Sequence, residues 1–178
     1  MARLPKRKRA VRNAILVSVV LLLVLVAVGV VDAASKPRLR EKASAEVYIV
    51  RVGSAPADVQ TNGELLDRLY PVIPATKHLS PASLAQSNAD LGRMHDAFDE
   101  DQRRLSVAAG RPWRSQAVQA ADGCRELESA VAAAREYLQD FKPSELADFH
   151  TQLAKAEADW NAGIRPIYVV VGKEPPTI

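Results

Sequence analysis

The densest group of acidic side chains contains Asp96, Asp99, Glu100 and Asp101. On a helix, Asp96 and Glu100 share a face because they are four residues apart, and two carboxylates can hold a divalent cation. The segment lacks the glycine-containing, oxygen-rich loop that is typical of calcium sites. Arg103 and Arg104 follow Asp99 and Glu100 by four residues, the order that favours ion pairs on a helix. We therefore interpret the cluster as a solvated, ion-paired face and expect no metal.

The remaining side chains that could do chemistry form no recognisable constellation. The three histidines, His78, His95 and His150, are far apart and lack metal-ligand spacing, although His95 and His150 can meet if their helices pack. Cys124, the single cysteine, lies among small and apolar residues at helical spacing, and burial raises the pKa of a thiol and lowers its reactivity. The eight glycines form no phosphate-binding loop. We expect no catalytic residue, no cofactor and no enzymatic activity.

One stretch decides which solvent the rest of the chain meets. Residues 14–31 read AILVSVVLLLVLVAVGVV, 18 residues without a charge. At a rise of ~1.5 Å per residue, a helix of this length covers about 27 Å, close to the hydrocarbon core of a bilayer. The sequence predicts an uncleaved transmembrane helix at 14–31. Two alternatives stay open: a signal peptide cleaved near residues 31–34, which would make the protein secreted, and a buried helix of a soluble protein.

Charges on the two sides of this stretch indicate its orientation. Residues 1–13 form a tail whose charges are all positive: Arg3, Lys6, Arg7, Lys8, Arg9 and Arg12. The following connector carries Lys36, Arg38, Arg40 and Lys42, diluted by two acids. The positive-inside rule then favours a cytoplasmic N-terminus and an extracytoplasmic C-terminal domain in the cell membrane, with the basic tail as the topology signal. The abundance of Ala, Val and Arg suggests a bacterial envelope.

Composition limits what the downstream part can be. Residues 32–178 number 147, enough for one domain with a core, and a single cysteine allows no internal disulfide. All 21 acidic residues lie in this part with 18 basic ones, so its formal charge is −3 although the whole chain has +3. This balance argues against nucleic acid as a partner.

Turn residues and hydrophobic patterns divide the domain. We expect a connector at 32–45, then a short strand, a short helix and a proline-containing loop within 46–80. A helical bundle follows at 81–165, with helices of about 81–109, 112–141 and 143–162, each beginning at or near a proline: Pro81, Pro112 and Pro143. Ser80 is a good N-cap for the first helix. Residues 166–178 are expected to form a strand and a disordered tail, with Gly163 ending the last helix and Pro166 opposing its continuation.

A regular hydrophobic seam is the strongest structural pattern in the domain. Spacings alternating between 4 and 3 connect nine residues of the middle helix: Trp113, Ala117, Ala120, Cys124, Leu127, Val131, Ala134, Leu138 and Phe141. The last helix continues with Leu146, Phe149, Leu153, Ala156 and Trp160, at spacings of 3 and 4. Gly92 and Gly123 lie inside helices, where glycine is unfavourable, which indicates a close helix contact or a local bend.

Short connections make neighbouring helices antiparallel, so the fold class is mainly α: a transmembrane helix followed by a coiled-coil-like, antiparallel three-helix bundle. A two-stranded β element can be added if residues 47–52 pair with residues 167–171; alternatively, both segments extend helices. Around Pro143 we expect a tight hairpin, while a proline kink in one long helix is the alternative. The equal spacing of the three prolines reflects helices of similar length in one bundle, with internal duplication as the alternative.

These features favour a binding role over chemistry. The layout of a basic tail, a single span and an external bundle occurs in many envelope proteins and by itself transfers no residue roles. The first hypothesis is a single-pass membrane protein whose external bundle binds another protein, or itself, in a structural, adaptor or sensing role. The alternative is a sensor that holds a small molecule between its helices, in a pocket lined by His95 or His150, and an envelope enzyme is the third.

Overall fold

The computed structural model describes residues 38–108 and 110–178, and every regular element within them is helical. Lys42–Ile178 forms one compact unit, whereas residues 38–41 belong to a separate one. The predicted transmembrane segment 14–31 and the basic tail 1–13 lie outside the described residues. Within the described ranges, no helix is both long and apolar enough to cross a bilayer.

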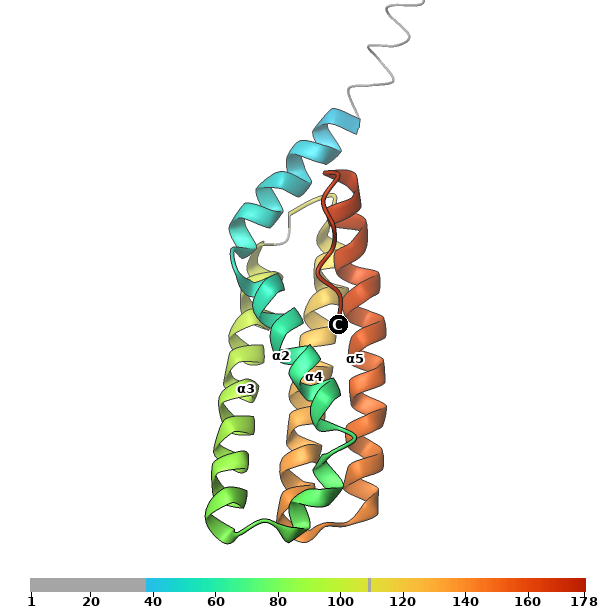
Figure 1. The fold of residues 1–178 in the computed structure, drawn as a ribbon. Helices are drawn as coiled ribbons and strands as arrows, with labels where there is room; N and C mark the ends of the chain where they lie inside the picture. Colours follow the sequence, from blue (N-terminus) through green and yellow to red (C-terminus); the bar gives the residue numbers. More distant parts are fainter. Residues whose placement is uncertain (1–37, 109) are drawn as a thin grey trace, which may run out of the picture. The chain divides into compact units, whose positions relative to one another are not determined.

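Three long helices form the body of the unit (Figure 1): α3 (Pro81–Ala108), α4 (Arg114–Asp140) and α5 (Pro143–Val170). They run antiparallel, and α4 packs against both of the others. A shorter helix, α2 (Ala55–Leu69), lies across α3 and α4, and the 3₁₀-helix η1 (Ile73–His78) contacts α4. The prediction of a mainly α fold is confirmed, but α2 and the helical residues 42–52 add to the expected three-helix bundle.

The expected β element is wrong, because residues 46–52 and 167–170 are helical in this structure. Ala45, Tyr48 and Val52 follow one another at helical spacing and are all buried. In the same way, Ile164 and Ile167 continue the buried face of α5. The tendency of β-branched residues to occur in strands depends on how their side chains pack and is not a fixed backbone preference. Packing against the bundle therefore decides the conformation of these segments.

The last helix continues past both expected terminators. Gly163 and Pro166 lie inside α5, which ends at Val170 and not near residue 162. A proline removes one helical hydrogen bond, and burial of Ile164 and Ile167 on either side of it offsets that loss. The following residues are ordered rather than disordered, because the Trp160 Nε1 donates to the Pro176 carbonyl at 2.8 Å.

Two helix boundaries agree with their sequence signals. The Ser83 backbone N–H donates to the Ser80 Oγ at 3.2 Å, so Ser80 caps α3 as expected. The chain leaves α4 through Phe141 in the left-handed conformation (φ 56°), and α5 begins at Pro143. The connection at Pro143 is therefore a tight hairpin and not a kink in one helix.

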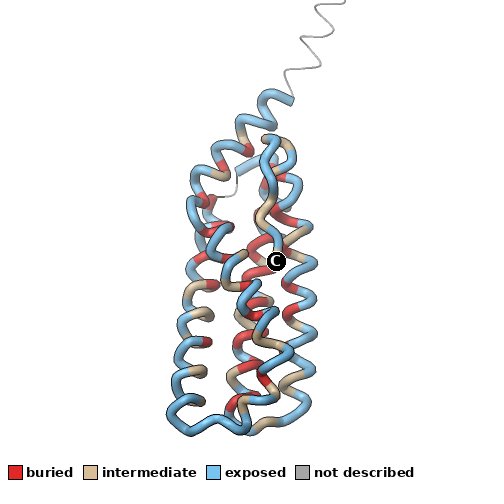
Figure 2. Tube along the Cα trace, in the orientation of Figure 1, coloured by how far each residue is buried: buried red, intermediate tan, exposed pale blue. Residues whose placement is uncertain are grey.

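The seam residues lie inside the unit. The inner face of α4 is buried along its length (Figure 2). Buried seam residues are Trp113, Ala117, Ala120, Cys124, Leu127, Val131, Ala134, Leu138, Phe149, Leu153, Ala156 and Trp160. Phe141 and Leu146, at the hairpin, are partly buried and pack against this core. The seam is thus covered by the chain itself and not left open for a partner helix.

Helices α4 and α5 approach each other closely at two glycines, Gly123 and Gly163. A Cβ atom at Gly123 would lie 2.8 Å from the Trp160 backbone nitrogen, and one at Gly163 would lie 2.4 Å from the Ala120 backbone nitrogen. Backbone atoms cannot move aside as the end of a flexible side chain can. Gly92 differs, because its nearest neighbours would be Arg135 side-chain atoms at 3.9 Å.

Gly163→Ala is therefore expected to destabilise the fold by about 2–3 kcal/mol or more, because the added methyl group pushes α5 away from α4. Gly92→Ala is the matched control. It is expected to stabilise the protein by up to about 1 kcal/mol, because alanine is the better helix former and the space is free. Thermal unfolding followed by circular dichroism measures both variants. Equal effects of the two substitutions would contradict the close approach.

Candidate functional site

The acidic cluster on α3 divides into exposed and buried members. Asp99 pairs with Arg103, and the Glu100 Oε1 accepts from the Arg104 Nε at 3.0 Å, both pairs four residues apart as expected. Asp96 is solvent-exposed. No group of three or more His, Cys, Asp or Glu side chains within the described ranges could hold a metal ion. The cluster acts as an ion-paired helix face.

Asp101 is the exception, because its carboxyl lies in the core with only 3% of the residue exposed. Burial raises its pKa from 3.8 to about 6, with a smaller contribution from the Asp58 carboxylate on α2. Glu100 raises the pKa further, whereas the Arg104 guanidinium lowers it. The sequence places this aspartate where the apolar seam of α3 is interrupted, and the structure shows that it nevertheless faces inward.

The histidines do not form a site. His150 is exposed and stacks on Tyr70, with ring centroids 4.7 Å apart. The His95 Nδ1 lies 3.8 Å from an oxygen of its neighbour Asp96. Burial raises the pKa of Glu128 on α4, and nearby His95 offsets part of that rise. His78 lies at the exposed end of η1. His95 and His150, which could have met if their helices packed together, have different neighbours in this structure.

Cys124 is a fully buried, free thiol. Burial raises its pKa far above the ordinary range, and the nearby Asp101 and Glu128 carboxylates raise it further. Tyr48 lies close to it, and its buried hydroxyl has no hydrogen-bond partner in the described part of the chain. A thiol that stays protonated is a poor nucleophile, so this pair of buried groups belongs to the packing of the core.

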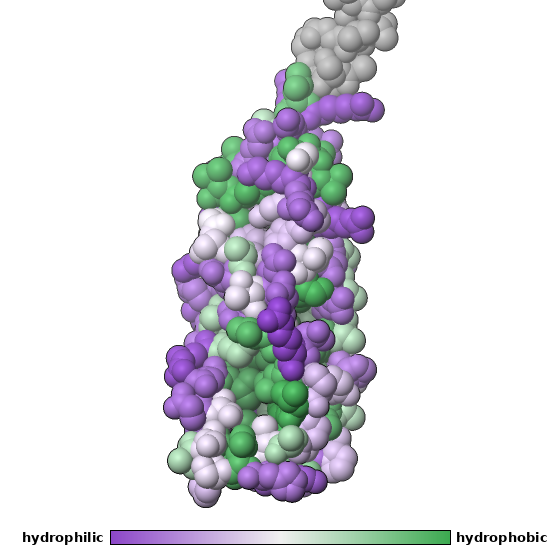
Figure 3. Space-filling view, in the orientation of Figure 1, coloured by the Kyte–Doolittle hydropathy of each residue, from purple (hydrophilic) through white to green (hydrophobic). Residues whose placement is uncertain are grey.

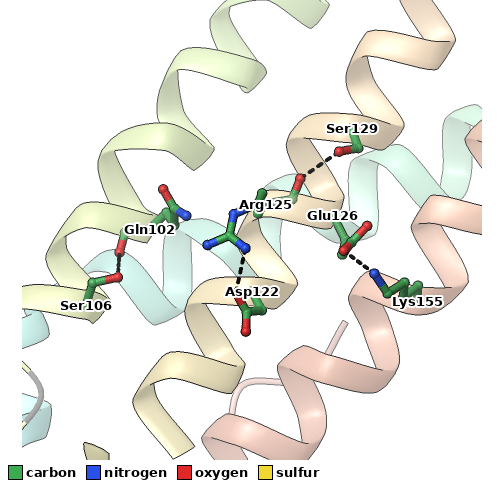
Figure 4. Close-up of polar contacts among 7 residues, drawn as sticks. All are labelled: Gln102, Ser106, Asp122, Arg125, Glu126, Ser129 and Lys155. Carbon is green, nitrogen blue, oxygen red and sulfur yellow. Dashed lines mark hydrogen bonds and ion pairs between the residues drawn. The ribbon is translucent and has the colours of Figure 1, made fainter. Parts of the chain in front are cut away.

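Polar contacts between the helices are structural in character (Figure 4). Glu126 on α4 pairs with Lys155 on α5, and within α4 the Arg125 Nη1 lies 2.8 Å from the Asp122 Oδ1. Gln102 on α3 lies beside the same Arg125 guanidinium. Most of these groups are exposed, so each pair contributes little to stability, and of the two ion pairs only Glu126–Lys155 joins neighbouring helices.

The best candidate for a functional surface is a groove lined by Arg51, Arg103, Arg104, Val107 and Ala108, which we call the arginine–valine groove. Its volume is about 530 Å³. Val107 is 86% exposed, and Val50, beside Arg51 on the neighbouring helix, is 79% exposed. Val47 shares the face of Val50 and Arg51 because of its helical spacing, and it is also exposed. Solvent-exposed apolar side chains next to arginines are typical of protein interaction surfaces.

The groove lies at the proximal end of the bundle, which we define as residues 42–54, 101–118 and 163–174. Contacts join these segments, since the Ser44 Oγ donates to the Arg111 carbonyl and Gly53 shares a cavity with Tyr168. This end carries eight basic residues and three acidic ones, one of which is the buried Asp101. Residues 42–178 as a whole carry 15 basic and 19 acidic residues. A net acidic unit therefore has one basic end. Figure 3, which is coloured by hydropathy, shows hydrophobic (green) and hydrophilic (purple) surfaces side by side in its upper part.

Sequence reasoning missed this groove. Arg51 and Val50 were read as part of a strand, and the partners of Arg51 in the groove lie more than 50 residues further along the chain. The available signal was the spacing of Val47, Val50 and Arg51 in a helix whose opposite face is buried.

Replacement of Asp101 by asparagine is expected to stabilise the protein above pH 6 by about 2–3 kcal/mol, from ~1.4 kcal/mol per pKa unit. In the wild type, the folded state holds the Asp101 proton up to about pH 6, whereas the unfolded chain loses it near pH 3.8. The contribution of Asp101 to stability is thus largest below pH 3.8 and falls as the pH rises to about 6.

Unfolding of wild type and Asp101→Asn at pH 4 and pH 8, followed by circular dichroism, measures this difference. The gain should appear at pH 8 and shrink at pH 4. Asp96→Asn, at an exposed position on the same helix, is the control and should show little change. If the gain in stability for Asp101→Asn were the same at both pH values, the pKa of Asp101 would not be raised in the folded state, and the prediction would be wrong.

Comparison with known proteins gives no relative from which a role could be transferred. No family model matches the chain, no curated protein matches it, and no solved structure matches its fold. The function must therefore be argued from the burial, charge and surface of the described residues.

Proposed function

We propose that this protein is a single-pass membrane protein whose extracytoplasmic helical unit binds another protein through the arginine–valine groove. The observation that carries the proposal is the exposure of Val47, Val50 and Val107 around three arginines at the proximal end of the bundle. Such exposure of apolar surface is unfavourable for an isolated protein and is relieved when a partner covers it.

The charge of the groove indicates the kind of partner. A segment with acidic side chains beside apolar ones complements arginines that surround valines. Arg103 and Arg104 already pair with Asp99 and Glu100, so their charge is partly compensated within α3. Arg51, on the other helix, is the arginine whose replacement is expected to weaken partner binding most.

The membrane part of the proposal rests on the sequence. The 18 uncharged residues 14–31 match the thickness of a bilayer, and the basic tail before them favours a cytoplasmic N-terminus. Residue 42, where the helical unit begins, is only 11 residues beyond Val31. Under this proposal residues 42–54, which contribute Arg51 to the groove, are the part of the unit nearest to the membrane segment along the chain.

The role is structural, adaptor-like or sensing, and not catalytic. The seam that first suggested self-association is covered by the chain's own helices, so a partner needs another surface. The small-molecule alternative has less support, because His95 and His150 line none of the three cavities described in this structure.

Arg51→Glu is expected to reduce capture of the partner at least tenfold, because a carboxylate replaces a cation where an acidic segment binds. A photo-crosslinking residue at Val107, in intact membranes, measures the yield of the crosslinked product. Arg93→Glu is the matched control, since Arg93 is an exposed arginine on α3 that lines none of the cavities described in this structure. Val72, exposed on a different part of the unit, is the control position for the crosslinker. Equal yields at Val107 and Val72 would contradict the groove as the binding surface.

Topology has a separate test. In a Cys124→Ala background, a cysteine at the exposed Ser106 is expected to react with a membrane-impermeant maleimide in intact cells. The labelled protein should keep the full mass of 19.3 kDa, because the anchor is not removed. Labelling only after lysis would reverse the orientation, and a smaller labelled protein in the medium would show a cleaved signal peptide.

A further inference from the structure

The residues after α5 fold back onto the bundle and occupy a groove between α2 and α5. Gly172 has a φ of 72° and reverses the chain, and the Lys173 N–H donates to the Tyr168 carbonyl at 3.1 Å. We call residues 174–178, which read EPPTI, the tail. It returns along α5 toward the middle of the helix (Figure 1).

Three contacts, two hydrogen bonds and one packing contact, hold the tail in the groove. The indole Nε1 of the fully buried Trp160 donates to the Pro176 carbonyl at 2.8 Å. The Asn161 Nδ2 donates to the Ile178 carbonyl at 3.2 Å. The Ile178 side chain lies against Gly63 on α2, where a Cβ would be 2.6 Å from the Ile178 Cγ2.

Each contact selects a feature of the occupant. Prolines fix φ near −65° and favour an extended segment, so the carbonyl of Pro176 has no helical hydrogen bond and is free to accept from Trp160. A tryptophan N–H that binds a carbonyl of a proline-rich segment is a recurring means of recognising such peptides. Gly63 lies inside α2, where alanine would be the better helix former, and its missing side chain leaves the space that the Ile178 side chain fills.

The groove extends beyond the position that Ile178 occupies. A cavity of about 260 Å³ lies next to Ile178 and is lined by apolar and charged groups from both helices: Gly63, Glu64, Asp67, Arg68, Leu153 and Glu157. Three of its four charged residues are acidic. A basic side chain that follows an aliphatic residue at this position would be attracted to these carboxylates.

We propose that the groove between α2 and α5 is a recognition site for an extended segment of a partner protein with the pattern Pro-Pro-x-aliphatic-basic, and that the tail occupies it in cis. The tail competes with the partner segment for the groove. Because a short tether gives the tail a millimolar effective concentration, ligands that bind weakly or in part do not displace it. The tail of a second copy of the chain is a less favoured occupant of this groove, because each tail reaches the groove of its own chain through a single turn. This site does not depend on the arginine–valine groove.

The test uses the full chain in detergent micelles, with Cys124→Ala and a nitroxide label on a cysteine at the exposed Thr177. The label should be immobilised in the free protein. The peptide KEPPTIK should release it at low millimolar concentration, whereas KEAATIK should not. KEPPTIE is the matched charge control and should need at least about threefold more peptide for the same release, because its last residue repels the acidic cavity.

Two variants test the contacts without added peptide. Trp160→Phe removes one hydrogen bond and should raise the ratio of mobile to immobilised label about fivefold. Gly63→Ala should raise it by a similar factor or more, because the new methyl group displaces Ile178. Gly92→Ala, distant from the tail and free of close contacts, should leave the ratio unchanged.

Several results would overturn the proposal. A label that is mobile in the free protein, or that stays immobilised at about 10 mM KEPPTIK, would exclude a tail that occupies a ligand site. Equal competition by KEPPTIK and KEAATIK would exclude proline recognition. Release that depends on the concentration of the chain itself, with dimers in sedimentation, would assign the groove to a second copy instead of a partner protein.

Discussion

The close approach of α4 and α5 is the constraint on which the rest of the fold depends. Gly123 faces the backbone of Trp160, and Gly163 faces the backbone of Ala120, so the two helices meet without intervening side chains at these levels. The Trp160 side chain is buried in the core beside this contact, and its indole N–H donates to the Pro176 carbonyl of the tail. It also keeps α5 regular beyond Pro166, because Ile164 and Ile167 remain buried against the neighbouring elements.

The sequence predicted the three long helices well because their signals are local and mutually consistent. Prolines at or near the helix starts, the Ser80 cap and the 3–4 spacing of the seam all act within one or two turns. The same local reasoning was wrong for residues 46–52 and 167–171. There, β-branched composition indicated strands, while the conformation is decided by which face packs on the bundle. In residues 45–52 the spacing of Ala45, Tyr48 and Val52 contained the correct answer, since it has a helical period.

The candidate sites could be predicted less well because they are assembled from segments far apart in the chain. Arg51 meets Val107 only after α3 has packed against the first helical segment, and Ile178 meets Gly63 only after α5 has placed the tail. The seam, by contrast, could be found in the sequence. There it suggested association with a partner helix, whereas the structure shows that it packs within one chain. Its residues are buried within one chain, and what a partner can reach is the surface around the helices.

This separation of core and surface explains how a mildly acidic, alanine-rich bundle could recognise other proteins. Small residues in the seam let the helices come close and complete a core, so the seam faces of α4 and α5 are buried within the described unit. The proposed binding surfaces lie where this regular packing ends. At the proximal end, two helices stop beside each other and leave valines exposed among arginines; along α2, a glycine leaves room for an aliphatic side chain. Both places suit short, irregular or amphipathic segments, and neither requires the bundle to open.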